Sequence, residues 1–337
     1  MKKPRLRALV LSAGHGTRLR PLTAFIPKPL LPVRGAAVLA HTIEQLVALG
    51  CEAIAINLFH RGEMIRESLG DSCGGVPLTF SIEEELLGTL GALGPLRSFL
   101  GRAEQILIIN GDSLCRWPLR SLVRRHVRSA ATATLLVSKR IDPGPFGGGV
   151  GVVDHRRIVS FRGDRDGDGD EVVRRVFMGA HVISPTLLDR VPAGAANFVP
   201  DLYEPLLSEG ARIDAVETAR RWHDLGTPER YRRAVLDWGR RKTWVDRDAE
   251  VASGARVRGS VIEQDASVEA EGVVGSSLVL PGSRVGSGCR VVESIVGPGV
   301  DLPPQTTVER RMVTPVRTDA KASDKASVVG GLVYEPI

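Results

Sequence analysis

Gly14-His15-Gly16-Thr17-Arg18-Leu19-Arg20-Pro21-Leu22-Thr23, followed by Pro27-Lys28-Pro29, is the stretch that decides the fold of this 337-residue chain. It comes directly after the apolar run at 7–11, which predicts a buried parallel strand. Glycines let the backbone approach a polyphosphate closely, and successive backbone N–H groups form an anion-binding nest. Arg18 adds a planar cation that suits phosphate oxygens. The segment therefore predicts a strand followed by a phosphate-binding loop.

This loop differs from the two best-known phosphate-binding patterns. No Gly-Lys-Ser/Thr follows the glycines, so the loop is not a Walker A loop. Leu19 stands where a dinucleotide-binding loop has its third glycine. Specificity comes from the second part of the stretch, because the prolines on both sides of Lys28 restrict where its ammonium points.

Strands and helices alternate outward from the loop, which predicts an α/β fold with a Rossmann-like, mostly parallel, doubly wound sheet. The expected strands up to Val137 lie at 53–56, 77–82, 105–109 and 132–137, and the expected helices at 38–49, 62–69, 89–100 and 119–128. Beyond Gly147 the pattern is richer in strands. These are expected at 150–153, 158–161, 172–183 and 212–216, with helices at 199–208 and 228–238.

After Trp244 the sequence becomes rich in Val, Gly and Ser. Apolar residues recur there at six-residue steps, namely Val245, Val251 and Val257, then Val279, Val285 and Val291. Such steps are typical of hexapeptide repeats and predict a short left-handed parallel β-helix, although the register is less regular between Val257 and Val279. The alternative is a plain β-rich tail of hairpins.

Asn110-Gly111-Asp112 ends an apolar strand, where ligands of open α/β sheets bind. Asp112 is therefore a candidate ligand for Mg²⁺, with a helix N-cap as the alternative.

Taken together, these motifs resemble the nucleotide-sugar pyrophosphorylases, the sugar-1-phosphate nucleotidyltransferases, in their mannose-1-phosphate guanylyltransferase-like form. The resemblance covers about Leu6 to Trp238, with Ser12-Ala13-Gly14 as a mild departure from the usual Ala-Gly-Gly or Ala-Ala-Gly. It implies catalytic, charge-neutralising roles for Arg18 and Lys28. The nucleotide-binding residues that it implies are Ala13, Gly14, Gly16, Thr17, Arg18 and Gly88.

The resemblance also implies a second metal ligand and a sugar pocket. Trp222-His223-Asp224-Leu225-Gly226-Thr227-Pro228-Glu229 is similar to a family motif whose Asp binds the metal, so Mg²⁺ would be held by Asp112 and Asp224. The implied sugar-phosphate-binding residues are Glu85, Gly147, Arg162 and Gly179. Many relatives carry Phe-x-Glu-Lys-Pro, but this chain has Phe161-Arg162-Gly163-Asp164. Arg162 is a candidate to replace the missing Lys, and the identity of the sugar stays open.

The expected activity is transfer of a nucleoside monophosphate from an NTP, preferably GTP, to a hexose 1-phosphate, which releases pyrophosphate and forms GDP-mannose or a related GDP-hexose. UDP- or dTDP-sugar synthesis is the alternative chemistry, and a catalytically silent regulatory subunit is the alternative class. A silent chain is expected to lose one of Arg18, Lys28, Asp112 or Asp224, and all four are present. An acyltransferase site in the tail is disfavoured because no His follows His223.

We expect a nucleotidyltransferase domain at 1–242, a β-helix at 243–312 and an unassigned tail at 313–337. A homo-oligomer is expected, formed through the β-helix. Four widely spaced cysteines predict reduced thiols in a cytoplasmic protein, and no apolar run is long enough for a membrane span. Aromatic residues make up 4% of the chain, so nucleic acid is not an expected partner. The basic cluster Arg124, Arg125, His126 and Arg128 is expected to be a solvated helix face, and Asp164–Gly169 a solvated loop rather than a calcium site.

Overall fold

The computed structural model describes residues 4–129, 131–162, 172–239, 241–317 and 323–337. By its internal contacts the chain divides into two units. The sheet unit contains Met1–Gly14 and Ala40–Trp222, and the coil unit contains His15–Leu39 and His223–Ile337. The segment that carries Arg18 and Lys28 therefore groups with the C-terminal part of the chain.

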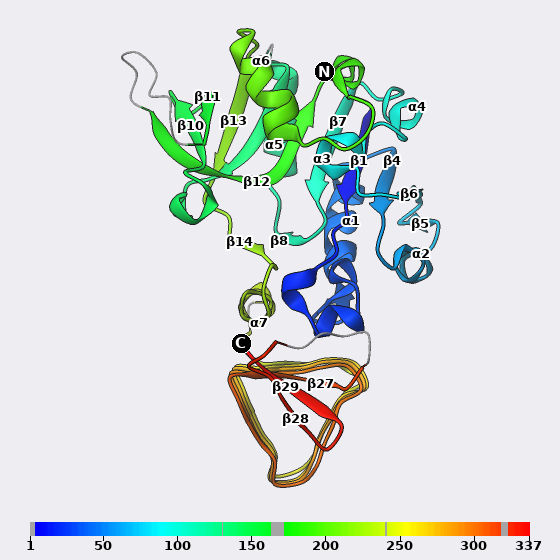
Figure 1. Cartoon of the computed structure of the whole chain (residues 1–337), viewed down its shortest axis with the longest axis vertical. Coiled ribbons are helices and arrows are strands. Elements are labelled where there is room, and N and C mark those ends of the chain that lie inside the picture. The colour runs from blue at the N-terminus through cyan, green and yellow to red at the C-terminus, as the bar shows by residue number, and fades with distance from the viewer. Residues whose placement is uncertain (1–3, 130, 163–171, 240, 318–322) are drawn as a thin grey trace. The chain divides into compact units, whose positions relative to one another are not determined.

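A ten-stranded sheet organises the sheet unit, in the order β10-β11-β13-β9-β12-β7-β1-β4-β6-β5 (Figure 1). Its strands are β1 (Leu6–Leu11), β4 (Ala53–Leu58), β5 (Ser72–Cys73), β6 (Val76–Ile82), β7 (Gln105–Asn110), β9 (Ala133–Ser138), β10 (Val150–Val153), β11 (Arg157–Phe161), β12 (Val173–Ile183) and β13 (Ile213–Thr218). Strand β1 runs parallel to both β4 and β7, and β9 runs parallel to β13. Strand β12 is antiparallel to its neighbours β7 and β9. The predicted α/β fold with a mostly parallel sheet is confirmed.

The helices confirm most of the expected pattern and correct it at two places. The helices α1 (Val38–Leu49), α2 (Gly62–Leu69), α5 (Leu119–Arg128) and α7 (Pro228–Trp238) lie where the periodicity predicts them. The single helix expected at 89–100 is wrong. It is two short helices, α3 (Gly88–Gly91) and α4 (Arg97–Leu100), because Gly94 and Pro95 disfavour a continuous helix between them. The segment at 199–208 is a π-helical turn, Val199–Tyr203, followed by α6 (Glu204–Ser208), in which Pro205 lacks an N–H donor.

Helix α5 also corrects the expected solvated basic face. His126 is buried, and its Nδ1 lies 2.9 Å from the Thr134 hydroxyl. Arg125 pairs at 2.8 Å with the carboxylate of the fully buried Asp214. Only part of the cluster is therefore solvated.

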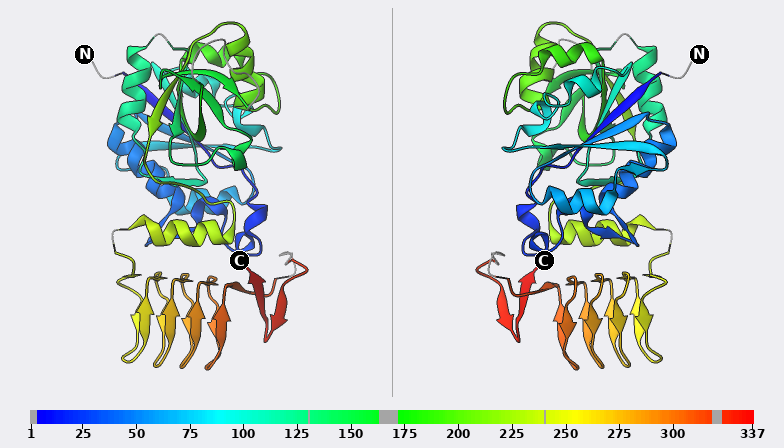
Figure 2. Two further views of the ribbon diagram at one scale, coloured as in Figure 1. Left: turned by 90° about the vertical axis from the view of Figure 1, so that its left-hand side faces the viewer. Right: turned by 90° about the vertical axis from the view of Figure 1, so that its right-hand side faces the viewer.

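Parallel coils of three short strands form the greater part of the coil unit, as the left-handed parallel β-helix prediction requires. Figure 2 shows the strands of successive coils side by side, from yellow to orange. One face holds β15 (Trp244–Val245), β18 (Val261–Ile262), β21 (Leu278–Val279), β24 (Ile295–Val296) and β27 (Arg311–Pro315). The second holds β16 (Glu250–Val251), β19 (Ser267–Val268), β22 (Arg284–Val285) and β25 (Asp301–Leu302), and the third β17 (Arg256–Arg258), β20 (Val273–Gly275), β23 (Arg290–Val292) and β26 (Thr307–Glu309).

Each coil is seventeen residues long, which explains the irregular register in the sequence. Glu250 pairs with Ser267, Ser267 with Arg284, and Arg284 with Asp301. Two steps of six are therefore followed by one of five, so the inward residue after Val257 is Ile262. From Ile262 onward, the inward-facing apolar side chains of the coils form a buried core.

Hydrogen bonds between serines stack one corner of the coils. Ser260, Ser277 and Ser294 recur at the seventeen-residue spacing and are fully buried. The Ser260 hydroxyl accepts the Ser277 N–H at 3.1 Å, and the Ser277 hydroxyl accepts the Ser294 N–H at 3.0 Å. Each buried hydroxyl is thereby satisfied.

A β-hairpin follows the last coil and assigns a structure to much of the tail at 313–337. Strand β29 (Leu332–Pro336) pairs antiparallel with β27 and with β28 (Ser327–Val329), which is the edge of that sheet. Leu332 packs into the apolar core of the coils.

No disulfide joins the four cysteines. Within the described residues no helix has the length and apolar character needed to cross a membrane.

Candidate nucleotide-binding site

A buried hydrogen-bond chain holds the start of the phosphate loop in the sheet unit. The Ser12 N–H donates to the Asn57 side-chain oxygen at 2.8 Å, and the Asn57 amide donates to Glu83 Oε1 at 2.8 Å. Glu83 Oε2 accepts the Leu87 N–H at 3.1 Å. The residue before Ala13 is therefore connected to the loop that carries Gly88. Sequence reasoning missed Asn57 and Glu83, although a polar residue within the apolar strand β4 was a usable signal.

Asp112 follows the carboxyl end of β7, and the phosphate loop follows the carboxyl end of β1. Because β1 and β7 are adjacent and parallel, both lie at the same end of the sheet. The Gly111 N–H donates to the Leu11 carbonyl at 2.8 Å, and a Cβ on Gly111 would lie only 2.4 Å from the Ser12 hydroxyl. Asp112 is half-buried, and its Oδ1 accepts the Ser113 hydroxyl at 3.4 Å. The structure thus brings Asp112 close to Ala13 and Gly14.

Gly88 is required by the fold itself. It has φ +71°, and a Cβ there would lie 2.5 Å from the Ala196 carbonyl oxygen. Thr89 begins the following turn, and its N–H donates to the Asn197 side chain at 3.2 Å. Glu85, the predicted sugar-binding carboxylate of this loop, is exposed. Gly14 differs from Gly88, because a Cβ on Gly14 would meet no protein atom within 4 Å.

Two of the predicted sugar-side residues lie in different surroundings. Gly179 has φ +78°, and a Cβ there would lie 2.5 Å from the Asn110 amide nitrogen, so it packs at the end of β7. Gly147 has φ +67° and open space beside it. The Phe146 ring before it lies 5.8 Å from the Trp222 ring, centroid to centroid. Only Gly179 is therefore packed directly beside the strand that leads to Asp112.

Arg162 is the last described residue before a gap in the described chain. Its backbone N–H donates to the Gly149 carbonyl at 2.9 Å, and it lines a hollow of about 490 Å³ that Phe161 and Glu204 also line. Gly163, Asp164 and the rest of the calcium-like segment lie outside the described residues.

In the coil unit the remainder of the phosphate loop folds into short 3₁₀ turns, at Thr17–Leu19, Leu22–Ala24 and Lys28–Leu30. Gly16 has φ +62°, and its carbonyl accepts the Thr23 hydroxyl at 3.0 Å. This bond holds the two halves of the opening motif together.

The two charged motifs meet within the coil unit. Lys28 is only 8% exposed, and its Nζ lies 3.8 Å from Oδ1 of Asp224. Arg230 donates to Oδ2 of the same carboxylate at 2.8 Å. Gly226 leaves room for Arg18, since a Cβ on Gly226 would lie 2.9 Å from the Arg18 Nη2. Sequence reasoning missed Arg230, which lies in the first turns of α7, after the Thr227 N-cap.

The charge balance of this cluster favours a polyanion. Lys28 and Arg230 contact the carboxylate of Asp224, and the Arg18 guanidinium lies beside Gly226 of the same motif. Cations held in fixed positions by the fold bind phosphate oxygens without further ordering cost.

Two carboxylates are the donor set available for a metal. Among the described residues no group of three or more His, Cys, Asp or Glu side chains could hold an ion. Mg²⁺, however, commonly binds one or two carboxylates and completes its shell with phosphate oxygens and water. Asp112 belongs to the sheet unit and Asp224 to the coil unit, and each presents the oxygen ligand type that Mg²⁺ prefers.

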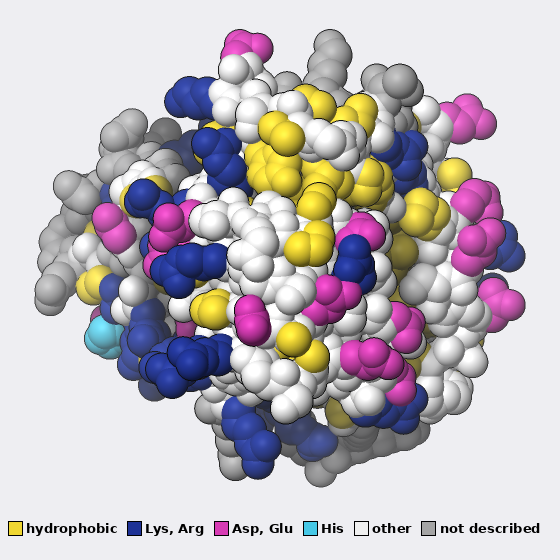
Figure 3. All heavy atoms as spheres, turned by 90° about the horizontal axis from the view of Figure 1, so that it is seen from below, with side chains coloured by type: hydrophobic (Ala, Val, Ile, Leu, Met, Phe, Trp, Pro, Cys, Tyr) yellow, Lys and Arg dark blue, Asp and Glu magenta, His cyan; other side chains and the backbone are white. Residues whose placement is uncertain are grey.

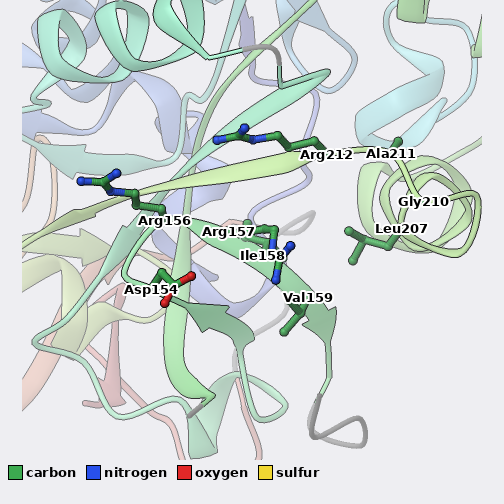
Figure 4. Close-up of a pocket in the computed structure, with 9 residues that line it drawn as sticks. All are labelled: Asp154, Arg156, Arg157, Ile158, Val159, Leu207, Gly210, Ala211 and Arg212. Atoms are coloured by element: carbon green, nitrogen blue, oxygen red, sulfur yellow. The ribbon is translucent and has the colours of Figure 1, made fainter. Parts of the chain in front are cut away.

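A further hollow of the sheet unit lies away from these residues. It measures about 750 Å³ and contains none of the predicted site residues. Arg156 lines it from the turn between β10 and β11, Arg157 from the start of β11, and Arg212 from the segment before β13 (Figure 4). Arg212 is bound to Asp214 at 2.8 Å, so part of its charge is neutralised.

Comparison with known proteins supports both parts of the chain. Residues 7–240 match the model of the nucleotidyl transferase family, and residues 243–322 match the GlmU-like C-terminal hexapeptide family. A mannose-1-phosphate guanylyltransferase of Mycobacterium tuberculosis is 30% identical over 90% of this chain and 83% of its own length. The mannose-1-phosphate guanylyltransferase catalytic subunit beta of Drosophila pseudoobscura is 28% identical over 85% of this chain and 72% of its own length.

A solved structure shares the fold. HddC from Yersinia pseudotuberculosis, at 23% identity, matches with a TM-score of 0.57 over 69% of this chain and 99% of its own. The same protein is also known in a complex with GMP-PN, with a TM-score of 0.57 and 22% identity over 69% of this chain and 99% of its own.

Proposed function

The chain belongs to the nucleotidyl transferase family and is an enzyme of nucleotidyl transfer to sugar phosphates, and we propose that its substrates are GTP and a hexose 1-phosphate. The product would be GDP-mannose or a related GDP-hexose. The relatives named mannose-1-phosphate guanylyltransferase support this choice of base and sugar. UDP- or dTDP-sugar synthesis by the same chemistry is the alternative. A silent regulatory subunit is disfavoured because Arg18, Lys28, Asp112 and Asp224 are all present.

The reaction needs no protein nucleophile. A phosphate oxygen of the sugar 1-phosphate attacks the α-phosphorus of the nucleotide, the bond from that phosphorus to the bridging oxygen breaks, and pyrophosphate leaves with the negative charge. Catalysis then consists of positioning and of charge stabilisation. The single observation that carries the proposal is the cluster in which Lys28 and Arg230 contact Asp224 and Arg18 lies beside Gly226.

Each predicted residue has a proposed part in this reaction. Arg18 and Lys28 would hold the triphosphate and stabilise the charge on the leaving pyrophosphate. Nucleotide binding would further involve Ala13, Gly14, Gly16, Thr17 and Gly88. Glu85, Gly147, Arg162 and Gly179 would lie toward the sugar phosphate.

Nucleotidyl transferases of this kind generally use a divalent metal, and we propose Mg²⁺ with Asp112 and Asp224 as its protein ligands. When bound, the ion would supply positive charge beside the phosphate oxygens. The chain's own contribution is to hold the two carboxylates, Asp112 at the end of β7 and Asp224 between Lys28 and Arg230.

The direct test of the proposed function measures pyrophosphate release with Mg²⁺ present. All four NTPs are paired in turn with mannose, glucose and N-acetylhexosamine 1-phosphates. GTP with mannose 1-phosphate should give the highest kcat/KM. The function proposal fails if no pair exceeds the rate of the Asp112→Ala variant.

We also propose domain boundaries, a cellular location and an oligomeric state for the chain. Nucleotidyl transfer would belong to residues 1–242 and the β-helix to 243–312, in a cytoplasmic protein. A homo-oligomer would form through the β-helix and the hairpin that follows it. Val316, Val328 and Val329 of the C-terminal hairpin region are exposed, and β28 is an edge strand. On the face drawn in Figure 3, apolar side chains gather toward one edge, and exposed apolar patches commonly mark interfaces.

A further inference from the structure

A small hairpin in the coil unit follows Lys28 directly. It consists of β2 (Pro32–Val33) and β3 (Ala36–Ala37), joined by the two-residue turn Arg34-Gly35. Both turn residues have positive φ, +54° and +84°. Leu31 connects the hairpin to the lysine, because its N–H donates to the Lys28 carbonyl at 3.2 Å while its own carbonyl accepts the Val38 N–H at 3.0 Å. The position of Lys28 therefore depends on where this hairpin is held.

A carboxylate of the β-helix holds the tip of the hairpin. Glu263 Oε1 accepts the Arg34 N–H at 2.7 Å, and Oε2 accepts the Gly35 N–H at 2.8 Å. Glu263 follows β18 and is only 1% exposed. Trp244 of the same coil face also packs at this turn, since a Cβ on Gly35 would lie 3.4 Å from its ring. Both oxygens of a buried carboxylate are thus used on two adjacent backbone donors, a directional contact.

The Arg34 side chain extends the contact to helix α7. Its guanidinium donates to the carbonyls of Val235 at 3.1 Å, Leu236 at 2.9 Å and Arg241 at 2.9 Å. These bonds satisfy carbonyls near the C-terminal end of α7, where a cation is favourable. The buried Tyr231 hydroxyl of α7 donates to the Pro32 carbonyl at 2.6 Å. Asp224 lies just before the first turn of this helix, so both members of the Lys28–Asp224 pair are attached to one framework.

We propose that Glu263, acting through Arg34 and Gly35, is a positioning residue that sets Lys28 relative to Asp224 for triphosphate binding. The β-helix is then part of the nucleotide site as well as a candidate oligomerisation element. The inference rests on the proposed function, because it takes GTP as the substrate. It gives a role in nucleotide binding to Glu263, which lies outside the family motifs identified in this sequence.

The environment of Glu263 supplies a readout that a purely structural role lacks. Burial raises the pKa of Glu263 to about 7, although the N–H groups of Gly35 and Arg34 oppose the shift. The charged or titratable groups that face it are Asp246, whose charge raises this pKa, Arg34, whose charge lowers it, and the Tyr231 hydroxyl. As the pH falls through about 7, one carboxyl oxygen gains a proton and stops being a full acceptor. Nucleotide affinity should therefore fall on the acid side of pH 7.

The experiment compares Glu263→Ala and Glu263→Gln with a matched control, Glu269→Ala. Glu269 is also a coil carboxylate that accepts a backbone N–H, from Ser287 at 2.9 Å, and it pairs with Arg284, but no contact links it to the hairpin among the described residues. For each variant the KM for GTP, the kcat, the pH profile and the thermal midpoint are measured. GTP binding is also measured by titration calorimetry without the sugar phosphate.

Glu263→Ala should raise the KM for GTP at least about tenfold, the loss expected for a charge-assisted hydrogen-bond pair, with a smaller change in kcat. Glu263→Gln keeps one acceptor oxygen, so its KM for GTP should rise less. Because the amide does not titrate, the pH profile of this variant should lose its acid limb. Glu269→Ala should match wild type. A Glu263→Ala enzyme whose KM and GTP affinity stay within about twofold of wild type would overturn the inference, as would an acid limb retained in Glu263→Gln.

The two proposals fail in distinguishable ways. If wild type releases no pyrophosphate with any substrate pair, the proposed function fails, yet calorimetry still reports whether Glu263 controls GTP binding. If Lys28 variants lose activity and Glu263 variants keep it, only the positioning role fails. Should Glu263→Ala not fold, the isosteric Glu263→Gln and the variant Arg34→Lys, which loses the planar fork, decide the question.

Discussion

The Nζ of Lys28 lies 3.8 Å from Oδ1 of Asp224, and both residues belong to the coil unit. One residue comes from the opening proline-flanked motif and the other from the motif before α7. The same carboxylate also accepts a hydrogen bond from the Arg230 guanidinium at 2.8 Å. The carboxylate of Asp224 therefore contacts cations from two distant parts of the sequence.

Replacing Lys28 by methionine should lower kcat/KM for GTP at least about 100-fold, the typical effect of removing one preorganised donor from a developing charge. Methionine keeps the length of the chain at this buried position, so the thermal midpoint should change little. Lys28→Arg should not restore activity, because a planar guanidinium needs more room at a site that is only 8% exposed. The exposed Lys139, replaced by methionine, is the control. Full activity of Lys28→Met would remove this lysine from the mechanism.

Asp112→Asn and Asp224→Asn should each raise the Mg²⁺ concentration needed for half-maximal rate and lower kcat at saturating Mg²⁺. An amide oxygen lacks the charge that a hard cation prefers. Asp189→Asn, an exposed carboxylate of the sheet unit, is the matched control. The measurement is pyrophosphate release titrated with Mg²⁺ from zero. An unchanged Mg²⁺ requirement in either variant would exclude that aspartate as a ligand.

Two glycine substitutions should separate binding from folding. Gly14→Ala adds a Cβ that meets no protein atom within 4 Å, so it should unfold at the wild-type temperature but raise the KM for GTP if the nucleotide approaches this backbone. Gly88→Ala forces a Cβ to 2.5 Å from the Ala196 carbonyl at φ +71° and should destabilise by more than about 2 kcal/mol. Chemical denaturation and steady-state kinetics measure the two effects. Wild-type kinetics in Gly14→Ala would contradict close approach at that glycine.

Stability of the sheet unit should fall in mild acid because of buried histidines. Burial lowers the pKa of His126 to about 4 and that of His181 to about 3. Since an unfolded histidine titrates near 6.5, the unfolded chain binds these protons first, and stability present above about pH 6.5 is lost as the pH falls toward 4. For His126 the loss should be on the order of 3 kcal/mol.

The variant His126→Gln tests this assignment by urea denaturation between pH 4 and 7.5. It should be less stable than wild type at pH 7.5 but should lose less stability on acidification. The control is the same substitution at an exposed histidine, His155→Gln. An equally steep loss in His126→Gln would show that other groups cause it.

The double variant Val328→Lys and Val329→Lys should reduce the mass of the protein in solution. Both side chains are 63% exposed on the edge strand β28, and lysines on an edge oppose pairing with another chain. Analytical ultracentrifugation measures the mass, and Met64→Lys, at an exposed position in the sheet unit, is the control. A monomeric wild type, or an oligomer unchanged in the double variant, would contradict self-association through the hairpin.

Much of the fold follows from local pattern. Apolar periodicity indicates which face of an element is buried. It therefore predicts the strand at 7–11, the helices at 38–49 and 228–238, and the repeated coils. The helix expected at 89–100 failed since Gly94 and Pro95 outweigh the surrounding periodicity. The coil length could not be read from the sequence, because one five-residue step interrupts the six-residue spacing of the apolar residues. The register of Glu250, Ser267 and Arg284 shows that each coil has seventeen residues.

The sequence by itself determined the reaction class, through the glycines, Arg18 and Lys28 of the opening motif and through Asp112 and Asp224 in theirs. The charged residues carry their chemistry in their side chains, and the glycines expose backbone N–H groups at a recognisable spacing. Tertiary structure alone decided that Lys28 meets Asp224, that Arg230 joins them, and that Glu263 holds the Arg34-Gly35 turn. The partners of Glu263 are backbone N–H groups, which every residue except proline possesses. A contact of that kind leaves no mark in the sequence, so only the folded chain can show it.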